Sequence, residues 1–176
     1  MSKVFFISDL HLGHENMAKK RGFLSADEMN KRIIHNWNSV VHKRDIVWVL
    51  GDITMETSKH YHLLSQLNGG INVVLGNHDR PNDIPLLYRY VTKICGMIKY
   101  KGFILSHAPI HELEVDRFRA NIHGHTHENH MLKHSMVCDY VCQKDPRYIN
   151  VSCEVVDYTP ILFETILKNY EDSKEK

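Results

Sequence analysis

The sequence predicts a single domain of the α/β or α+β class, in which helices cover a sheet. Short apolar runs alternate with helix-length amphipathic segments in the first half, and strand-like runs dominate the second half. The chain has 176 residues, the size of one ordinary domain, and can bury a core without disulfides or a structural metal. We therefore expect one domain over residues 1–176.

Three apolar runs in the first half predict buried strands, at residues 3–8, 45–52 and 71–79. Each strand ends in side chains that can bind a metal ion, namely Asp9 and His11, then Asp52, then Asn77 and His78. In open α/β sheets, ligands bind beyond the carboxyl ends of the strands. The repetition therefore predicts that these side chains gather at one edge of the sheet.

Helices are predicted at residues 25–41, 58–67 and 160–170. The first has Ser25 as its N-cap and Glu28 three residues later, followed by apolar residues at helical spacing. The last has Pro160 in its first turn, and the tail after it is expected to be frayed.

Strand-like runs in the second half predict two or three strands within residues 90–109, ending at His107. Further strands are predicted at 120–127 and 148–156, with an irregular region between them from 128 to 147. That region is a candidate for a substrate lid or a subunit contact.

Composition gives no sign of a membrane or nucleic-acid partner. The formal net charge is +1, and 24% of the residues are charged, so no global field attracts either partner. The apolar run near the N-terminus is too short for a signal peptide or a membrane span. The four cysteines are unevenly spaced, which favours reduced thiols. We expect a cytoplasmic protein.

The stretch "SDLHLGH" at residues 8–14 introduces the candidate site. Asp9 and His11, two residues apart on one face of an extended chain, can aim a carboxylate and an imidazole at one point. Later segments add His107, His125 and His127 to the polar residues that follow strands. This mixture of oxygen and nitrogen donors without thiolates suits Mn, Fe, Zn, Co or Ni. It exceeds what one ion needs, and therefore favours two ions that share a carboxylate.

The motifs "DLH", "GD", "GNHD", "SHAP" and "GHTH", in this order, resemble the five sequence blocks of the calcineurin-like metallophosphoesterase superfamily. The resemblance covers nearly the whole chain. The opening "SDLHLGH" and the closing "INVSCEVVDYTP" are similar to a branch of small bacterial and phage phosphoesterases. The resemblance to the superfamily implies a four-layer αββα sandwich of two mixed sheets flanked by helices.

The resemblance also implies a role for each matching residue. Asp9, His11 and His127 would hold the first metal ion, Asp52 would bridge, and Asn77, His107 and His125 would hold the second. His78 would face the substrate and act as a catalytic residue, while a metal-bridging hydroxide attacks phosphorus in line. The ions would be two divalent metals, Mn foremost, with Fe, Zn, Ni, Co or Mg as options.

Other residues near the motifs have two interpretations each. Asp79 is a second candidate catalytic residue, by orienting a ligand or His78, or it is a turn residue. His14, Arg80, Arg117 and Arg119 are candidates for contacts with the substrate phosphate, or are surface and helix-start residues. His123 is expected beside the ligands or in the core. His134, Cys138 and Cys142 share one side of a possible helix, but lack a fourth ligand for zinc.

We expect a metal-dependent hydrolase that acts on a small phosphoester. Nucleotides are among the candidate substrates, and a phosphodiester is favoured. A phosphomonoesterase, a nuclease and a dinucleoside polyphosphate hydrolase are the enzymatic alternatives, although no basic groove supports a nuclease. A metal-binding scaffold without catalysis is the alternative from another class. The oligomeric state is left open.

Overall fold

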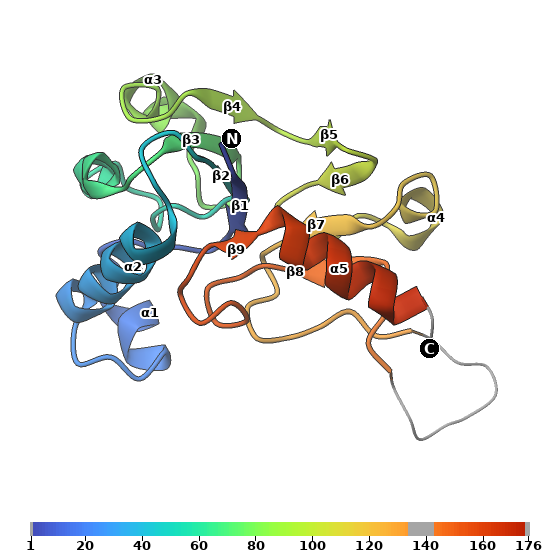
Figure 1. Cartoon of the computed structure of the whole chain (residues 1–176). Coiled ribbons are helices and arrows are strands. Elements are labelled where there is room, and N and C mark those ends of the chain that lie inside the picture. The colour runs from blue at the N-terminus through green and yellow to red at the C-terminus, as the bar shows by residue number, and fades with distance from the viewer. Residues whose placement is uncertain (1, 134–142, 175–176) are drawn as a thin grey trace.

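The computed structural model describes residues 2–133 and 143–174, and it contains two mixed β-sheets (Figure 1). The first sheet has the strand order β4-β3-β2-β1-β9, and the second has the order β5-β6-β7-β8. The strands of the first sheet are β1 (Val4–Ile7), β2 (Ile46–Val49), β3 (Gly70–Val74), β4 (Lys93–Cys95) and β9 (Ile161–Leu162). Those of the second are β5 (Ile98–Tyr100), β6 (Phe103–Leu105), β7 (Asn121–His123) and β8 (Tyr148–Asn150).

Parallel pairing dominates both sheets. Strands β1 to β4 run parallel to one another, and β9 joins β1 antiparallel. In the second sheet β6, β7 and β8 are parallel, and β5 pairs antiparallel with β6. Because parallel strands end at the same edge of a sheet, the loops after β1, β2 and β3 emerge together, as do those after β6 and β7.

Helices flank the sheets, as Figure 1 shows. They are α1 (Glu15–Lys20), α2 (Ala26–Val40), α3 (Ile84–Leu87), α4 (Glu112–Val115) and α5 (Phe163–Lys174), with 3₁₀ helices η1 (Tyr61–Gln66) and η2 (Pro81–Asp83). The side chain of Ser25 accepts a hydrogen bond from the Glu28 amide, so α2 has the N-cap that the sequence predicts. The predicted fold class, two mixed sheets flanked by helices, is confirmed.

Two apolar clusters hold the layers together. One lies between the first sheet and the α1–α2 side, and it contains Phe5, Ile7 and the fully buried Trp37. The other contains Phe6 from β1, Phe103 from β6 and residues of α5. Alternation along β1 thus sends neighbouring side chains to opposite faces of the first sheet, which is buried on both sides.

Several predicted element boundaries are wrong. The segment 58–67 forms the 3₁₀ helix η1, and the strands predicted at 120–127 and 148–156 end at His123 and Asn150. After both strands the chain enters loops that contact residues following β1: the His125 amide donates to the Asp9 carboxylate, and the Cys153 amide donates to the Ser8 carbonyl. Residues 134–142, with His134, Cys138 and Cys142, lie outside the described residues.

The last helix begins later and continues further than predicted. Residues 161 and 162 first pair with Phe5 and Phe6 as strand β9, so the helix starts at Phe163. Its end is anchored by Tyr170, whose ring centroid lies 5.4 Å from that of Phe103, and whose hydroxyl donates to the carbonyl oxygen of Arg119. The predicted fraying of 171–174 is therefore wrong. Within the described part of the chain, no helix has the length and apolar content needed to cross a membrane.

Candidate metal centre

Main-chain hydrogen bonds join the two sheets where their parallel strands end. The Ser8 amide donates to the Val151 carbonyl at 2.9 Å, and the Cys153 amide donates to the Ser8 carbonyl at 3.0 Å. On the second sheet, the Gly124 amide donates to the His107 carbonyl at 2.8 Å. The loops after β1, β6, β7 and β8 are thereby fixed against one another, which brings distant candidate ligands to one place.

Asp9, His11 and His127 form one group that could hold a metal ion, with ligand atoms all within 4.8 Å of one another. The His11 residue is 1% exposed, and both its ring nitrogens are buried without a hydrogen-bond partner among the described residues. Burial, and next the charge of Arg21, lowers the pKa of His11 to about 3. The imidazole is therefore neutral and keeps a free lone pair, as a metal ligand must.

Asp9, Asp52 and His107 form a second such group. Asp52 Oδ2 lies 3.4 Å from His107 Nε2 and 3.9 Å from His11 Nε2, so this oxygen is close to both groups. Burial alone would raise the pKa of Asp52, but the hydrogen bond and charge of His107 outweigh it and hold that pKa below its ordinary value. Asp52 is therefore a carboxylate near neutral pH.

Asn77 and His125 complete the second group. Asn77 Oδ1 lies 2.9 Å from His107 Nε2 and 3.0 Å from His125 Nδ1. The two imidazole nitrogens are themselves 3.2 Å apart. The second His107 nitrogen, Nδ1, lies 2.8 Å from the Leu50 carbonyl oxygen, which orients the ring so that Nε2 faces this cluster.

Five of the candidate ligands adopt left-handed backbone conformations, with φ values of 58° at Asp9, 47° at His11, 54° at Asp52, 69° at His125 and 50° at His127. The expectation that Asp9 and His11 share one face of an extended chain is therefore wrong, because β1 ends at Ile7 and the chain turns. Each left-handed non-glycine residue costs of order 1–3 kcal/mol and tends to persist at functional sites.

Gly76 shows how closely the backbone approaches these ligands. A Cβ atom at this position would overlap Asp52 Oδ1 and would lie 2.6 Å from the Asp52 amide nitrogen. Only glycine leaves room for the carboxylate here, which explains the glycine of the "GNHD" motif.

Asp79 holds the loops after β2 and β3 together. Its carboxylate accepts hydrogen bonds from the amides of Asp52 at 2.9 Å, Ile53 at 3.1 Å and Gly76 at 2.8 Å. Burial raises the pKa of Asp79 to about 6, against the amide hydrogen bonds that favour its charged form. The side chain thus contacts the backbone around the candidate ligands.

His78 lies beside the cluster and is open to solvent. Its side chain is 28% exposed, and its ring centroid lies 5.9 Å from that of His11. The His78 amide donates to Asp52 Oδ1 at 3.0 Å, and its ring Nδ1 lies 3.3 Å from Glu56 Oε1. The Nδ1 side of the ring thus faces a carboxylate.

The candidate substrate contacts lie in different places. His14 is the N-cap of α1, with its ring centroid 6.4 Å from that of His11, so it lies near the centre. Arg80 pairs with Asp83 at 3.2 Å. Arg117 pairs with Glu114 on the surface, and the Arg119 guanidinium lies over the rings of Phe103 and Tyr170. Arg119 therefore lies near the start of β6, whereas His107 follows its end.

His123 is buried at the end of β7. Its Nδ1 lies 2.8 Å from the Gly124 carbonyl oxygen, and burial lowers its pKa to about 4. The strand ends at His123, which is 0% exposed, in line with the expected place in the core.

Sequence reasoning missed Arg21, Glu154 and Glu56. Glu154 Oε1 lies 2.9 Å from His127 Nδ1 and 2.8 Å from Arg21 Nε. Burial would raise the pKa of Glu154, but the hydrogen bond from His127 and the charge of Arg21 outweigh it and lower that pKa to about 2. A signal was present for Glu154, the single charged residue within the apolar run "YINVSCEVV".

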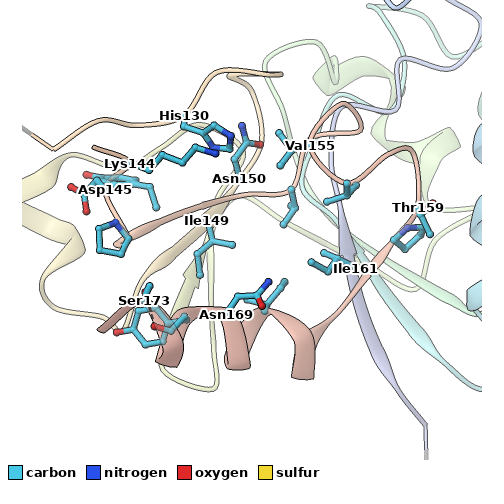
Figure 2. Close-up of a pocket in the computed structure, with 17 residues that line it drawn as sticks. His130, Lys144, Asp145, Ile149, Asn150, Val155, Thr159, Ile161, Asn169 and Ser173 are labelled. Atoms are coloured by element: carbon cyan, nitrogen blue, oxygen red, sulfur yellow. Dashed lines mark hydrogen bonds between the residues drawn. The ribbon is translucent and has the colours of Figure 1, made fainter. Parts of the chain in front are cut away.

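A cavity of about 660 Å³ lies elsewhere, between β8, the segment before β9 and α5 (Figure 2). Ile149, Val155 and Ile161 give it an apolar lining, with Asn150 and Asn169 as polar groups. The candidate metal ligands do not line it. The centre is instead a polar cluster at the strand ends.

Comparisons with known proteins identify close relatives in sequence. The chain is 36% identical to the uncharacterized protein MJ1445 of Methanocaldococcus jannaschii, over 99% of this chain and 94% of that protein. It is 30% identical to the Gene 66 protein of Mycobacterium phage D29, over 88% and 89% of the two chains. No family model matches the sequence.

Solved structures also resemble this fold. The structure of the Aquifex aeolicus protein AQ665, described as of unknown function, aligns with a TM-score of 0.68 at 28% identity, over 96% of this chain and 99% of that one. An archaeal phosphodiesterase aligns with a TM-score of 0.49 at 19% identity, over 86% and 85%. A likeness at that level carries no functional argument.

Proposed function

We propose that this chain, which belongs to the protein family of archaeal MJ1445 and the phage D29 Gene 66 protein, is a phosphoesterase that depends on two divalent metal ions. One observation carries the proposal. Side chains from the ends of β1, β2, β6 and β7 converge into two groups of carboxylate and imidazole ligands that share Asp9, and Asn77 from the end of β3 lies against His107. Such overlap suits two ions that share ligands.

The donor set fits divalent metals. The His11 nitrogens are buried without a described partner, and the buried Asp52 carboxylate lies between His11 and His107, so a cation would offset the burial of these polar atoms. Asp9, His11 and His127 would hold one ion, and Asn77, His107 and His125 the other, with Asp52 between them. Bound ions would lower the pKa of water and neutralise charge on a phosphoryl group. Mn is our first choice among Mn, Fe, Zn, Ni, Co and Mg.

His78 is proposed as the catalytic residue that contacts the substrate. Its partly exposed ring lies next to the ligand cluster, beside His11. With Nδ1 toward Glu56, the ring is oriented so that Nε2 is free to face the leaving oxygen, and in its doubly protonated form the ring would deliver a proton there. Asp79 is proposed as a positioning residue, because its carboxylate contacts backbone amides of the two ligand loops.

We favour a small phosphodiester, such as one containing a nucleotide, as the substrate. The preference rests on the resemblance of "SDLHLGH" and "INVSCEVVDYTP" to a branch of small phosphoesterases. His14 and Arg80 are the candidate phosphate contacts nearest the loops after β1 and β3.

The proposal is tested with metal-stripped protein reconstituted separately with Mn, Ni, Co, Zn and Mg. We expect metal-dependent turnover of bis-(p-nitrophenyl) phosphate that exceeds turnover of p-nitrophenyl phosphate. His78→Ala should bind metal normally but lose at least about 100-fold in kcat, the scale of general acid catalysis. Monoester preference would replace the diesterase proposal with a phosphatase. Metal binding without hydrolysis of either ester would favour a non-catalytic scaffold.

A further inference from the structure

Arg21 is a buried cation beside the candidate metal ligands. It follows α1 as its C-cap, and its side chain is only 1% exposed. Its Nη2 donates to the Asp9 carbonyl oxygen at 2.7 Å, and its Nη1 donates to the Leu10 carbonyl oxygen at 3.3 Å. The guanidinium therefore holds the backbone of the left-handed turn that carries Asp9 and His11.

Glu154 connects this cation to the opposite loop. Its Oε1 accepts from Arg21 Nε at 2.8 Å and lies 2.9 Å from His127 Nδ1. An imidazole that donates from Nδ1 presents the lone pair of Nε2, so Glu154 sets both the tautomer and the direction of the His127 ring. One carboxylate oxygen thus links the loop after β1 to the loop after β7.

Through Glu154 the link reaches His127, which belongs to one ligand group alone, whereas Asp9, held through its carbonyl oxygen, belongs to both groups. Asp9, His11 and His127 form one ligand group, and two of these three have a backbone or ring atom bonded to Arg21 or Glu154. The ligands of the other half are oriented by different groups: His107 by the Leu50 carbonyl, and His125 by Asn77. The effect of removing Glu154, which contacts His127 directly, should therefore fall on one metal ion.

We propose that Arg21 and Glu154 are a positioning pair that preorganises the Asp9–His11–His127 site, and so sets the affinity of one of two metal ions without touching metal or substrate. The inference rests on the proposed two-metal centre. Preorganisation is needed here because Asp9, His11 and His127 all have strained left-handed backbones, which would relax without a partner that fixes them.

The test is Mn²⁺ binding by equilibrium dialysis and calorimetry on the full chain, with Glu154→Ala and Glu154→Gln. Wild-type protein should bind two ions. Glu154→Ala should bind one ion with unchanged affinity and the other about 10–100-fold more weakly, the usual effect of removing a group that orients a ligand. Glu154→Gln keeps an acceptor for His127 and should recover part of the loss.

Asp145→Ala is the matched control, because Asp145 is also a buried carboxylate paired with an arginine, Arg147 at 2.7 Å, away from the candidate ligands. It should lower the unfolding temperature but leave both Mn²⁺ affinities unchanged. If Glu154→Ala does not fold by circular dichroism, Arg21→Lys and Glu154→Gln are measured instead, with the same loss confined to one ion expected.

The outcomes separate this inference from the proposed function. Two Mn²⁺ ions bound at wild-type affinity in the variants, or equal loss of both ions, would overturn the positioning pair alone. Two ions bound by wild-type protein without phosphoester hydrolysis would overturn the phosphoesterase and leave the pair standing. Wild-type protein that binds no Mn²⁺ would overturn both.

Discussion

Asp52 Oδ2 lies 3.4 Å from His107 Nε2, and this contact joins the end of β2 in one sheet to the end of β6 in the other. The same oxygen is 3.9 Å from His11 Nε2. A single carboxylate oxygen therefore lies between imidazoles from both halves of the proposed centre. Because the two contacts come from separate sheets, the geometry of the centre depends on how the sheets are joined.

Asp52→Asn should abolish metal-dependent hydrolysis while the fold remains. The amide keeps the shape of the side chain but loses the charge that a shared ligand supplies to two cations. We expect at least about a 100-fold fall in kcat/KM for the diester, beyond the effect of altering a group that only orients a ligand. Asp27→Asn, at an exposed pair with Lys31, is the control and should be neutral. Wild-type-like turnover by Asp52→Asn would contradict the proposed two-metal centre.

Glu56→Gln should lower kcat with little change in KM. Glu56 Oε1 lies 3.3 Å from His78 Nδ1, and in the proposed mechanism this contact orients the ring for proton transfer from Nε2. Because the pair is partly exposed, we expect a loss of only about 10-fold. Steady-state kinetics of Glu56→Gln and of Glu114→Gln, a surface carboxylate paired with Arg117, make the comparison. Equal kinetics of the two variants would remove Glu56 from the mechanism.

Gly76→Ala should damage both the fold and the centre. The new Cβ would overlap the Asp52 carboxylate and approach the Asp52 backbone, and such crowding typically costs about 1–3 kcal/mol of unfolding free energy. Gly96→Ala is the matched control, since nothing lies within 4 Å of a Cβ built there. Urea unfolding and Mn²⁺ binding of both variants test this. An unchanged metal affinity in Gly76→Ala would show that Asp52 is free to move.

The candidate ligands could be predicted from the sequence because they follow apolar runs, and parallel strands end at a common edge. The prediction from strand alternation was wrong at Asp9 and His11, however. Period-two reasoning assumes that the strand continues, whereas β1 ends at Ile7 and each of these residues adopts a left-handed conformation. The residues were identified, but the backbone that aims them was not.

The partners of the ligands could not be predicted in the same way. Arg21 resembles any basic residue at a helix end, and only the folded chain places it on the Asp9 carbonyl and Glu154. Arg117 and Arg119 stay predictions for phosphate contact. Their local sequence suits phosphate binding, and the fold places them in surface pairs with Glu114 and Glu171. Contacts between segments distant in sequence decide which arginine lies against the candidate ligands, and a local sequence pattern does not show such contacts.

Asp145→Asn should make the stability of metal-free protein less sensitive to acid. Burial would raise the pKa of Asp145, but the hydrogen bonds and charge of Arg147 outweigh it and hold that pKa below the ordinary value of 3.8. A carboxyl whose pKa is lower in the folded state stabilises the protein above its ordinary pKa, and this contribution disappears as the pH falls toward the folded value. The difference in unfolding free energy between wild type and Asp145→Asn, here called the stability gap, should therefore be about 1–3 kcal/mol near pH 7 and should narrow below pH 4. Urea unfolding from pH 7 to pH 3, with chelator present throughout, measures the gap.

Because Asp145 is 4% exposed whereas Asp27 is a surface residue, Asp27→Asn should show almost no gap at any pH. A gap for Asp145→Asn that stays constant across this range would mean that the pair with Arg147 does not depend on the charge of Asp145.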